Sequence, residues 1–331
     1  MVRLDKTVRT SDGAAHSKCV ERAFPNTKCA TRVFSLGLIA LVCFLFSSTR
    51  APADDIYVAT SSGIEKFDSS GNESLFANIV GSGLAFDSSG YLYVANGNNN
   101  TIEKFDSSGT DLGVFADSGL NVPAGLAFDG SGNLFVLNVG DVTIMRFGPS
   151  GTGSLFVSIH TGISPQGPVF DKTGNLYVAI SDPPDGIVTI DKYDSMGSAS
   201  QLAFIFDPLT RRIGSGLAFD SNGDLYIALA NALTNTIDKV NSSGNVSPFA
   251  SSGSAWPRGL AFGSSGDLYV ANWSNNTIEK FDANGNGSVL ASGLNRPTAI
   301  AIQVPEPATW SLLALGVVTL FGSRRLHHRS S

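Results

Sequence analysis

The sequence of 331 residues has little cysteine and little histidine. Its three cysteines, Cys19, Cys29 and Cys43, all precede residue 54, so a protein that begins there after processing has no disulfide. His160 is the only histidine in 54–303. Histidine-based acid–base chemistry and multi-histidine metal sites need several such groups, so both classes are nearly excluded. We expect His160 to be an ordinary loop residue, and we predict no catalytic residue.

Basic side chains are also scarce in the same region. Residues 54–303 contain 24 Asp and Glu against 11 Lys and Arg, a balance of −13, whereas the whole chain carries −6. An acidic body of this kind repels nucleic acid and anionic membrane surfaces, so we expect neither as a partner.

Long hydrophobic runs are limited to the two ends of the chain. Val33–Phe46 is an apolar run preceded by Arg32 and followed by the small residues Ala51-Pro-Ala53. The run is shorter than the roughly 20 residues of a membrane span, and its flanks are those of a secretory signal peptide. The sequence therefore predicts a signal peptide with an extended n-region over 1–53 and a mature protein that begins at Asp54.

Glycine is abundant, with 36 residues, and much of it belongs to a repeat. The sequence Gly-Leu-Ala-Phe, or the variant Gly-Pro-Val-Phe, recurs at intervals of 42, 42, 49 and 43 residues, starting at Gly83, Gly125, Gly167, Gly216 and Gly259. Each copy is followed by a turn and then by Leu-Tyr-Val-Ala or a close relative. A period near 40 that contains only short strands and turns predicts a β-propeller.

The number of blades follows from the second strand of each repeat, which recurs six times, starting at Ile56, Leu92, Leu134, Leu176, Leu225 and Leu268. The first repeat lacks its first strand, and the segment 298–303 is a first strand with nothing after it. Pairing the two would complete one blade and remove the free sheet edges. We therefore predict an all-β, six-bladed propeller over 54–303, closed by the C-terminal strand on the N-terminal blade.

Aspartates recur in the turns between the first and second or the third and fourth strands, at Asp68, Asp87, Asp106, Asp129, Asp171, Asp194, Asp220 and Asp282. Such residues cap their own turns, although a row of them on one face could also gather calcium. Asp282–Gly287 resembles the start of a calcium loop, but position twelve is Gly293 rather than Glu. We expect turns and no metal site, and calcium stays open as a cofactor.

The loops on the opposite face vary in length and content, and variable loops on a rigid scaffold are where binding usually occurs. Trp256, Arg258, Trp273 and Arg296 all fall there, on or next to the sixth blade. Trp and Arg flanked by Asn suit a carbohydrate or peptide partner, so these four are the predicted ligand-binding residues. The simpler alternative is that Trp256 packs under its loop and the arginines are solvated.

The stretch Pro257–Asp282, with Gly-Leu-Ala-Phe, Leu-Tyr-Val-Ala-Asn and Thr-Ile-Glu-Lys-Phe-Asp, resembles the NHL-repeat family. The resemblance extends over 54–303 and implies a six-bladed propeller. That family and related lactonases and lyases range from protein or ligand binders to calcium enzymes. The family pattern has Asp where this chain has Asn96 and Asn272, and a basic residue where it has Thr101 and Thr277. The resemblance therefore implies a fold and not a reaction.

The C-terminal segment 304–331 begins with Val304-Pro305-Glu306-Pro307, continues with an apolar stretch over 308–322 and ends with a basic cluster. This order resembles the PEP-CTERM sorting signal, although a plain C-terminal anchor is the simpler alternative. The resemblance implies membrane contact through a transmembrane helix before processing, an exosortase as partner, and delivery to the cell surface or exopolysaccharide of a Gram-negative bacterium.

Two functions fit these observations. The first is a secreted, surface-sorted binding or structural module that contacts exopolysaccharide or an envelope protein. The second is a calcium-dependent lactonase or lyase with its metal in the central channel. The second needs inward carboxylates, but the innermost strands carry mainly Gly, Leu, Ala and Phe and no Glu. An enzyme is therefore the less favoured hypothesis.

Overall fold

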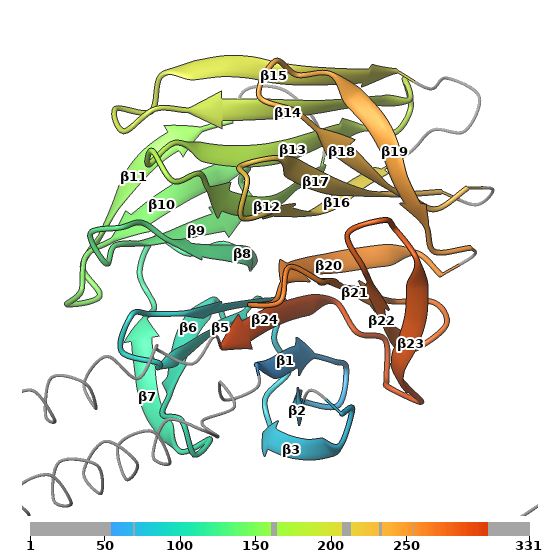
Figure 1. Ribbon diagram of the computed structural model, residues 1–331. Helices are drawn as coiled ribbons and strands as arrows, with labels where there is room; N and C mark the ends of the chain where they lie inside the picture. The colour runs from blue at the N-terminus through green and yellow to red at the C-terminus, as the bar shows by residue number, and fades with distance from the viewer. Residues whose placement is uncertain are drawn as a thin grey trace, which may run out of the picture. The chain divides into compact units, whose positions relative to one another are not determined.

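A computed structural model describes residues 54–303, apart from 69, 160–163, 207–212, 232–233 and 254. These residues form six four-stranded antiparallel sheets, the blades of a propeller (Figure 1). The predicted signal peptide, His160, the predicted sorting motif and the apolar stretch after it lie outside the described residues. Within the described ranges, the structure contains no helix long and apolar enough to cross a membrane.

The blades follow one another along the chain, and the four strands of each blade are given from the innermost to the outermost. Blade 1 consists of β24 (Ala299–Gln303), β1 (Asp55–Ala59), β2 (Ile64–Phe67) and β3 (Glu73–Ala77). Blade 2 consists of β4 (Gly83–Phe86), β5 (Leu92–Asn96), β6 (Thr101–Phe105) and β7 (Asp111–Ala116). Blade 3 consists of β8 (Pro123–Phe128), β9 (Leu134–Asn138), β10 (Thr143–Phe147) and β11 (Gly153–Ser158).

The second half of the ring repeats this arrangement. Blade 4 consists of β12 (Ser164–Phe170), β13 (Leu176–Asp182), β14 (Ile187–Tyr193) and β15 (Ala199–Phe206). Blade 5 consists of β16 (Ile213–Phe219), β17 (Leu225–Ala230), β18 (Thr236–Val240) and β19 (Val246–Ser251). Blade 6 consists of β20 (Pro257–Phe262), β21 (Leu268–Asn272), β22 (Thr277–Phe281) and β23 (Gly287–Ser292).

The ring closes through the last strand of the chain. In Figure 1 the red β24 lies beside the blue β1, and the two pair antiparallel with Ile56 opposite Ile302 and Val58 opposite Ile300. Ile300 is 7% exposed and packs in a cluster with Val58 and Tyr269. The closing strand therefore supplies both backbone pairing and apolar burial, as the incomplete first repeat predicted.

The repeated glycine has a physical cause in how closely neighbouring inner strands approach each other. A Cβ added at Gly83 would collide with the backbone of Ala124, and one at Gly216 with the backbone of Arg258. At Gly259 it would lie 2.8 Å from the Ile300 nitrogen of β24, closer than real Cβ atoms come. Only glycine allows the inner strands to pack this tightly around the axis.

Aromatic side chains of the second strands join neighbouring blades. The Tyr57 ring contacts Phe76 of its own blade and Phe86 of the next, both edge-on with ring centroids 4.9 Å apart. Tyr93, Phe135 and Tyr226 make the same pair of contacts in their blades. Both faces of the second strand are buried for this reason, which explains its continuous apolar sequence.

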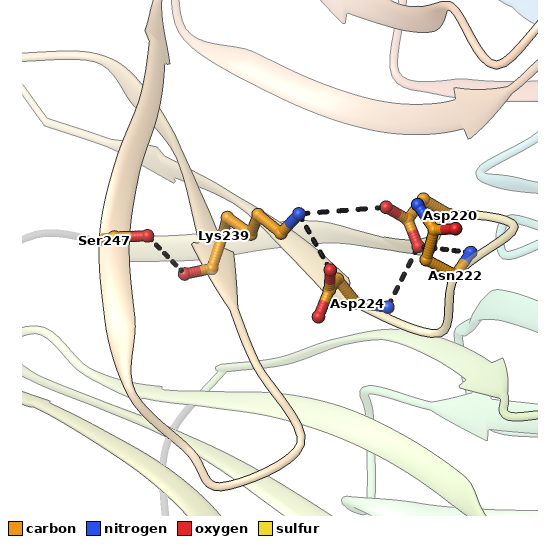
Figure 2. Close-up of polar contacts among 5 residues, drawn as sticks. All are labelled: Asp220, Asn222, Asp224, Lys239 and Ser247. Atoms are coloured by element: carbon orange, nitrogen blue, oxygen red, sulfur yellow. Dashed lines mark hydrogen bonds and ion pairs between the residues drawn. The ribbon is translucent and has the colours of Figure 1, made fainter. Parts of the chain in front are cut away.

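The aspartate turns between strands have the predicted geometry. Figure 2 shows the example in blade 5, where Asp220 Oδ1 accepts hydrogen bonds from the backbone N–H groups of Asn222 and Asp224 at 2.8 and 2.9 Å. Lys239 Nζ lies 2.8 Å from Asp224 and 3.9 Å from Asp220. The turn carboxylates are thus used in capping and in ion pairs with lysines of the same blade.

Candidate ligand-binding site

A cavity of about 880 Å³ lies along the inner strands. In every blade, the residue directly before the start of the repeat on the inner strand lies on the cavity wall. These six residues are Ser82, Ala124, Gln166, Ser215, Arg258 and Thr298. Of this set, only Arg258 was predicted from the sequence. The signal was nevertheless present in the sequence, because each of the six stands immediately before the repeated glycine or, in blade 1, before Ala299.

The side chains that line this cavity are mostly small, hydroxyl-bearing or apolar. Among the described residues on its wall, Arg258 is the only charged one, Gln166 the only amide, and none is Asp or Glu. The described residues also contain no group of three or more His, Cys, Asp or Glu that could hold a metal ion. Calcium takes six to eight oxygen ligands, with carboxylates prominent among them, so this donor set does not fit a channel calcium.

Trp256 and Trp273 come from two neighbouring loops of blade 6 that are hydrogen-bonded to each other. The Trp273 N–H donates to the Trp256 carbonyl at 3.0 Å, and the Ser274 N–H donates to the Ala255 carbonyl at 3.1 Å. The two indole rings are 6.1 Å apart with a tilt of 41°. Both side chains are half-buried. The backbone bonds therefore hold the pair in place while leaving part of each ring accessible.

The backbone at Trp256 is left-handed, with φ 51°, directly before Pro257. Arg296 and Val122 have the same conformation, with φ 51° and 49°, and each also precedes a proline at the start of an inner segment. Left-handed backbone outside glycine often marks functional sites. Because Val122 shares it in another blade, here it belongs to the repeat and is no sign of function.

Arg258 lies at a β-bulge, where the pairing of β20 with β21 shifts between Pro257 and Gly259. A bulge turns the side chain out of the regular alternation, and here Arg258 both lines the cavity and meets Trp273. Its guanidinium carbon is 5.0 Å from the centre of the Trp273 ring.

Arg296 reaches the same ring from the segment that leads into β24. Its guanidinium carbon is 5.2 Å from the Trp273 ring centre. Its backbone N–H donates to Asn276 Oδ1 at 2.9 Å, which fixes the segment against the loop between β22 and β21. The side chain itself is exposed.

The structure thus brings the four predicted residues together around one indole, from three separate segments. The simpler alternative holds in part, because Trp256 is half-buried and Arg296 faces solvent. Burial lowers the pKa of Arg258, because desolvation penalises its charged form. Cation–π contacts offset such a cost by roughly 0.5–2 kcal/mol each. The arrangement brings two cations and two aromatic rings together, and of these four residues Arg258 lines the cavity.

Two family models match parts of the chain. Residues 255–281 match the NHL repeat, and residues 303–325 match the PEP-CTERM protein-sorting motif. The chain is therefore a six-bladed β-propeller with an NHL repeat in its sixth blade. It also carries a bacterial sorting motif of the PEP-CTERM type, as the sequence resemblance indicated.

Several solved structures share the fold at low sequence identity. A chain of a nidogen–laminin complex aligns with a TM-score of 0.62 and 19% identity, covering 75% of this chain and 98% of that one. A gluconolactonase from Xanthomonas campestris aligns with 0.56 and 18%, covering 75% and 88%. Virginiamycin B lyase from Staphylococcus aureus aligns with 0.53 and 16%, covering 66% and 72%. No curated protein sequence matches the chain.

Proposed function

We propose that this protein is a secreted, surface-sorted binding module of the cell envelope or exopolysaccharide matrix of a Gram-negative bacterium. The sorting motif over 303–325 supports export and surface sorting. On this proposal the signal peptide 1–53 is removed on export, the tail helix contacts the membrane, and an exosortase processes the chain near Pro305–Pro307. The propeller over 54–303 is the part that acts at the surface.

The observation that supports binding most directly is the convergence of Trp256, Arg258 and Arg296 on Trp273. Arg258 connects this cluster to the cavity, whose wall it lines. Trp and Arg are the residue types that dominate binding energy at protein surfaces. The two loops that carry the rings are joined by backbone hydrogen bonds, so little backbone entropy is lost when a ligand docks on them.

The structural neighbours share the propeller fold, but they differ in what their names say they do. One comes from a protein–protein complex of nidogen and laminin, and two others are named as a lyase and a gluconolactonase. At less than 20% identity they carry the fold alone. The calcium-enzyme alternative has no comparable support within the chain, since the described cavity wall carries no carboxylate.

The proposal is tested by co-sedimentation of the full-length protein, purified in detergent, with exopolysaccharide and envelope fractions of a bacterium that has the sorting machinery. We expect Trp256→Ala with Trp273→Ala to reduce the bound fraction at least about tenfold, the scale of a hot-spot loss. The matched control is Phe204→Ala with Phe206→Ala, an exposed aromatic pair on β15 with ring centroids 6.4 Å apart. Binding that survives the Trp pair and is lost with the Phe pair would show that the site lies elsewhere.

A further inference from the structure

The guanidinium groups of Arg258 and Arg296 both lie over the Trp273 ring and have unused hydrogen-bond donors. Each stacks on Trp273, and within the described part of the chain neither makes an ion pair or a side-chain hydrogen bond. A guanidinium has five N–H donors, and a cation–π contact pairs none of them with an oxygen or nitrogen acceptor. The cluster therefore offers many donors and no acceptor.

The two cations are also close to each other. Both guanidinium carbons lie within 5.2 Å of the same ring centre, so they are no more than about 10 Å apart, which is close to one Debye length at moderate salt. Like charges at this distance repel. An anion that pairs with both guanidinium groups would relieve this repulsion and offset the desolvation that lowers the pKa of Arg258.

Four lysines of the propeller are neutralised within it. Lys66, Lys104, Lys239 and Lys280 lie 2.8 to 3.9 Å from aspartate oxygens of their own blades. The body carries a balance of −13 over 54–303, so carboxylates are plentiful. Among the described residues, Arg146 and Lys192 also lie over rings without an ion pair, but each is alone on its ring. Arg258 and Arg296 differ because they share one ring without a carboxylate, and we infer that their counterion comes from outside the domain.

We propose that the cluster formed by Trp256, Trp273 and the two arginines binds a uronate unit of an acidic polysaccharide. Arg258 and Arg296 hold the carboxylate of the uronate, and an apolar face of the sugar ring lies against the two indoles. This inference rests on the proposed binding function and names its ligand class. Guanidinium groups match carboxylates with paired hydrogen bonds. Aromatic rings suit the apolar faces of sugars, because they combine a flat apolar surface with a polar edge.

The neighbouring cavity wall favours a saccharide over an acidic peptide. Ser82, Ser215 and Thr298 offer hydroxyls, and Gln166 offers an amide, on the same wall as Arg258. Hydroxyl and amide groups pair with sugar hydroxyls as both donors and acceptors.

The test compares uronate polymers with ligands that lack either the carboxylate or the sugar ring. Binding of polygalacturonate and of its fully methyl-esterified form to the full-length protein in detergent is measured by calorimetry, with alginate as a second uronate and polyglutamate as an acidic peptide. We expect both uronates to bind, and the ester and polyglutamate to bind at least about tenfold more weakly, because each loses either the carboxylate or the sugar ring.

The variants are chosen to separate charge from stacking. Arg296→Gln changes an exposed side chain, and Arg258→Lys retains the charge while removing the planar fork. We expect each to weaken uronate binding about tenfold with an unchanged melting temperature. The matched control is Lys192→Gln, which removes another cation placed over an aromatic ring, 5.7 Å from the centre of Tyr177 in blade 4, and should leave affinity within about twofold.

Three results would overturn the inference. Equal binding of the ester, with Arg variants unaffected and Trp256→Ala defective, would make the cluster a neutral-sugar site and leave the proposed function intact. Polyglutamate that binds as tightly as the uronates would assign the site to an acidic peptide. Absence of binding to both uronates would refute the ligand class, while the sedimentation experiment with envelope fractions decides the broader function separately.

Discussion

Gly259→Ala tests whether contact between inner strands dictates the glycine of the repeat. The added Cβ would lie 2.8 Å from the Ile300 nitrogen and 3.0 Å from the carbonyl carbon and Cα of Ala299. All three are backbone atoms of β24, the strand that closes the ring. Backbone in a paired strand cannot rotate away as a side chain does, so the strand must shift as a whole.

The expected cost combines two opposed effects. Overpacking of this kind costs about 1–3 kcal/mol, and the reduced chain entropy of alanine in the unfolded state returns about 0.4–1 kcal/mol. The net loss of unfolding free energy is therefore about 1–2 kcal/mol. For a propeller of this size it corresponds to a fall in melting temperature of about 2–8 °C.

The matched control is Gly130→Ala, in the turn between β8 and β9, where an added Cβ meets no atom within 4 Å. Only the entropy term applies there, so the melting temperature should stay the same or rise. Both variants are compared by calorimetry and by urea unfolding under identical conditions. A Gly259→Ala protein as stable as Gly130→Ala would refute the claim that close packing around the axis requires glycine.

Two further predictions concern carboxylates. Burial raises the pKa of Glu279, whose Oε2 accepts from Asn272 Nδ2 at 2.9 Å while the buried Asn272 Oδ1 has no partner. Ionisation of Glu279 therefore lowers the free energy of unfolding as the pH rises. A glutamine at this position stays neutral and can donate to Asn272 Oδ1, so Glu279→Gln should raise the melting temperature at pH 7 by about 2–4 °C. The difference between the two proteins should shrink in acid, where Glu279 is protonated. Asp171 behaves oppositely: although its partial burial acts to raise its pKa, hydrogen bonds from Asn175 and Thr173 prevail and lower it to about 2. Asp171→Ala should lose about 1 kcal/mol at pH 7 by urea unfolding, and the gap should close as the pH falls from about 4 towards 2; a gap independent of pH would contradict this assignment.

The sequence predicted the scaffold well, because the features that define it are local and repeated. The six second strands, the aspartate turns and the unpaired segment 298–303 are each visible in a few adjacent residues. Period and strand count then leave one way to close the ring. The cavity wall was largely missed, because a residue such as Ser215 gains its position only when six inner strands converge on one axis.

The sequence by itself determined the number of blades, the closing strand and the group of loops that contains Trp256, Arg258, Trp273 and Arg296. Only the tertiary structure decided that both arginines stack on one ring and pair with no carboxylate. The physical reason is that stacking and charge compensation depend on distances between segments of different strands. Ring closure by β24 places the segment of Arg296 beside blade 6. The residues next to Arg296 in the sequence do not indicate that its guanidinium remains without a carboxylate after the ring has closed.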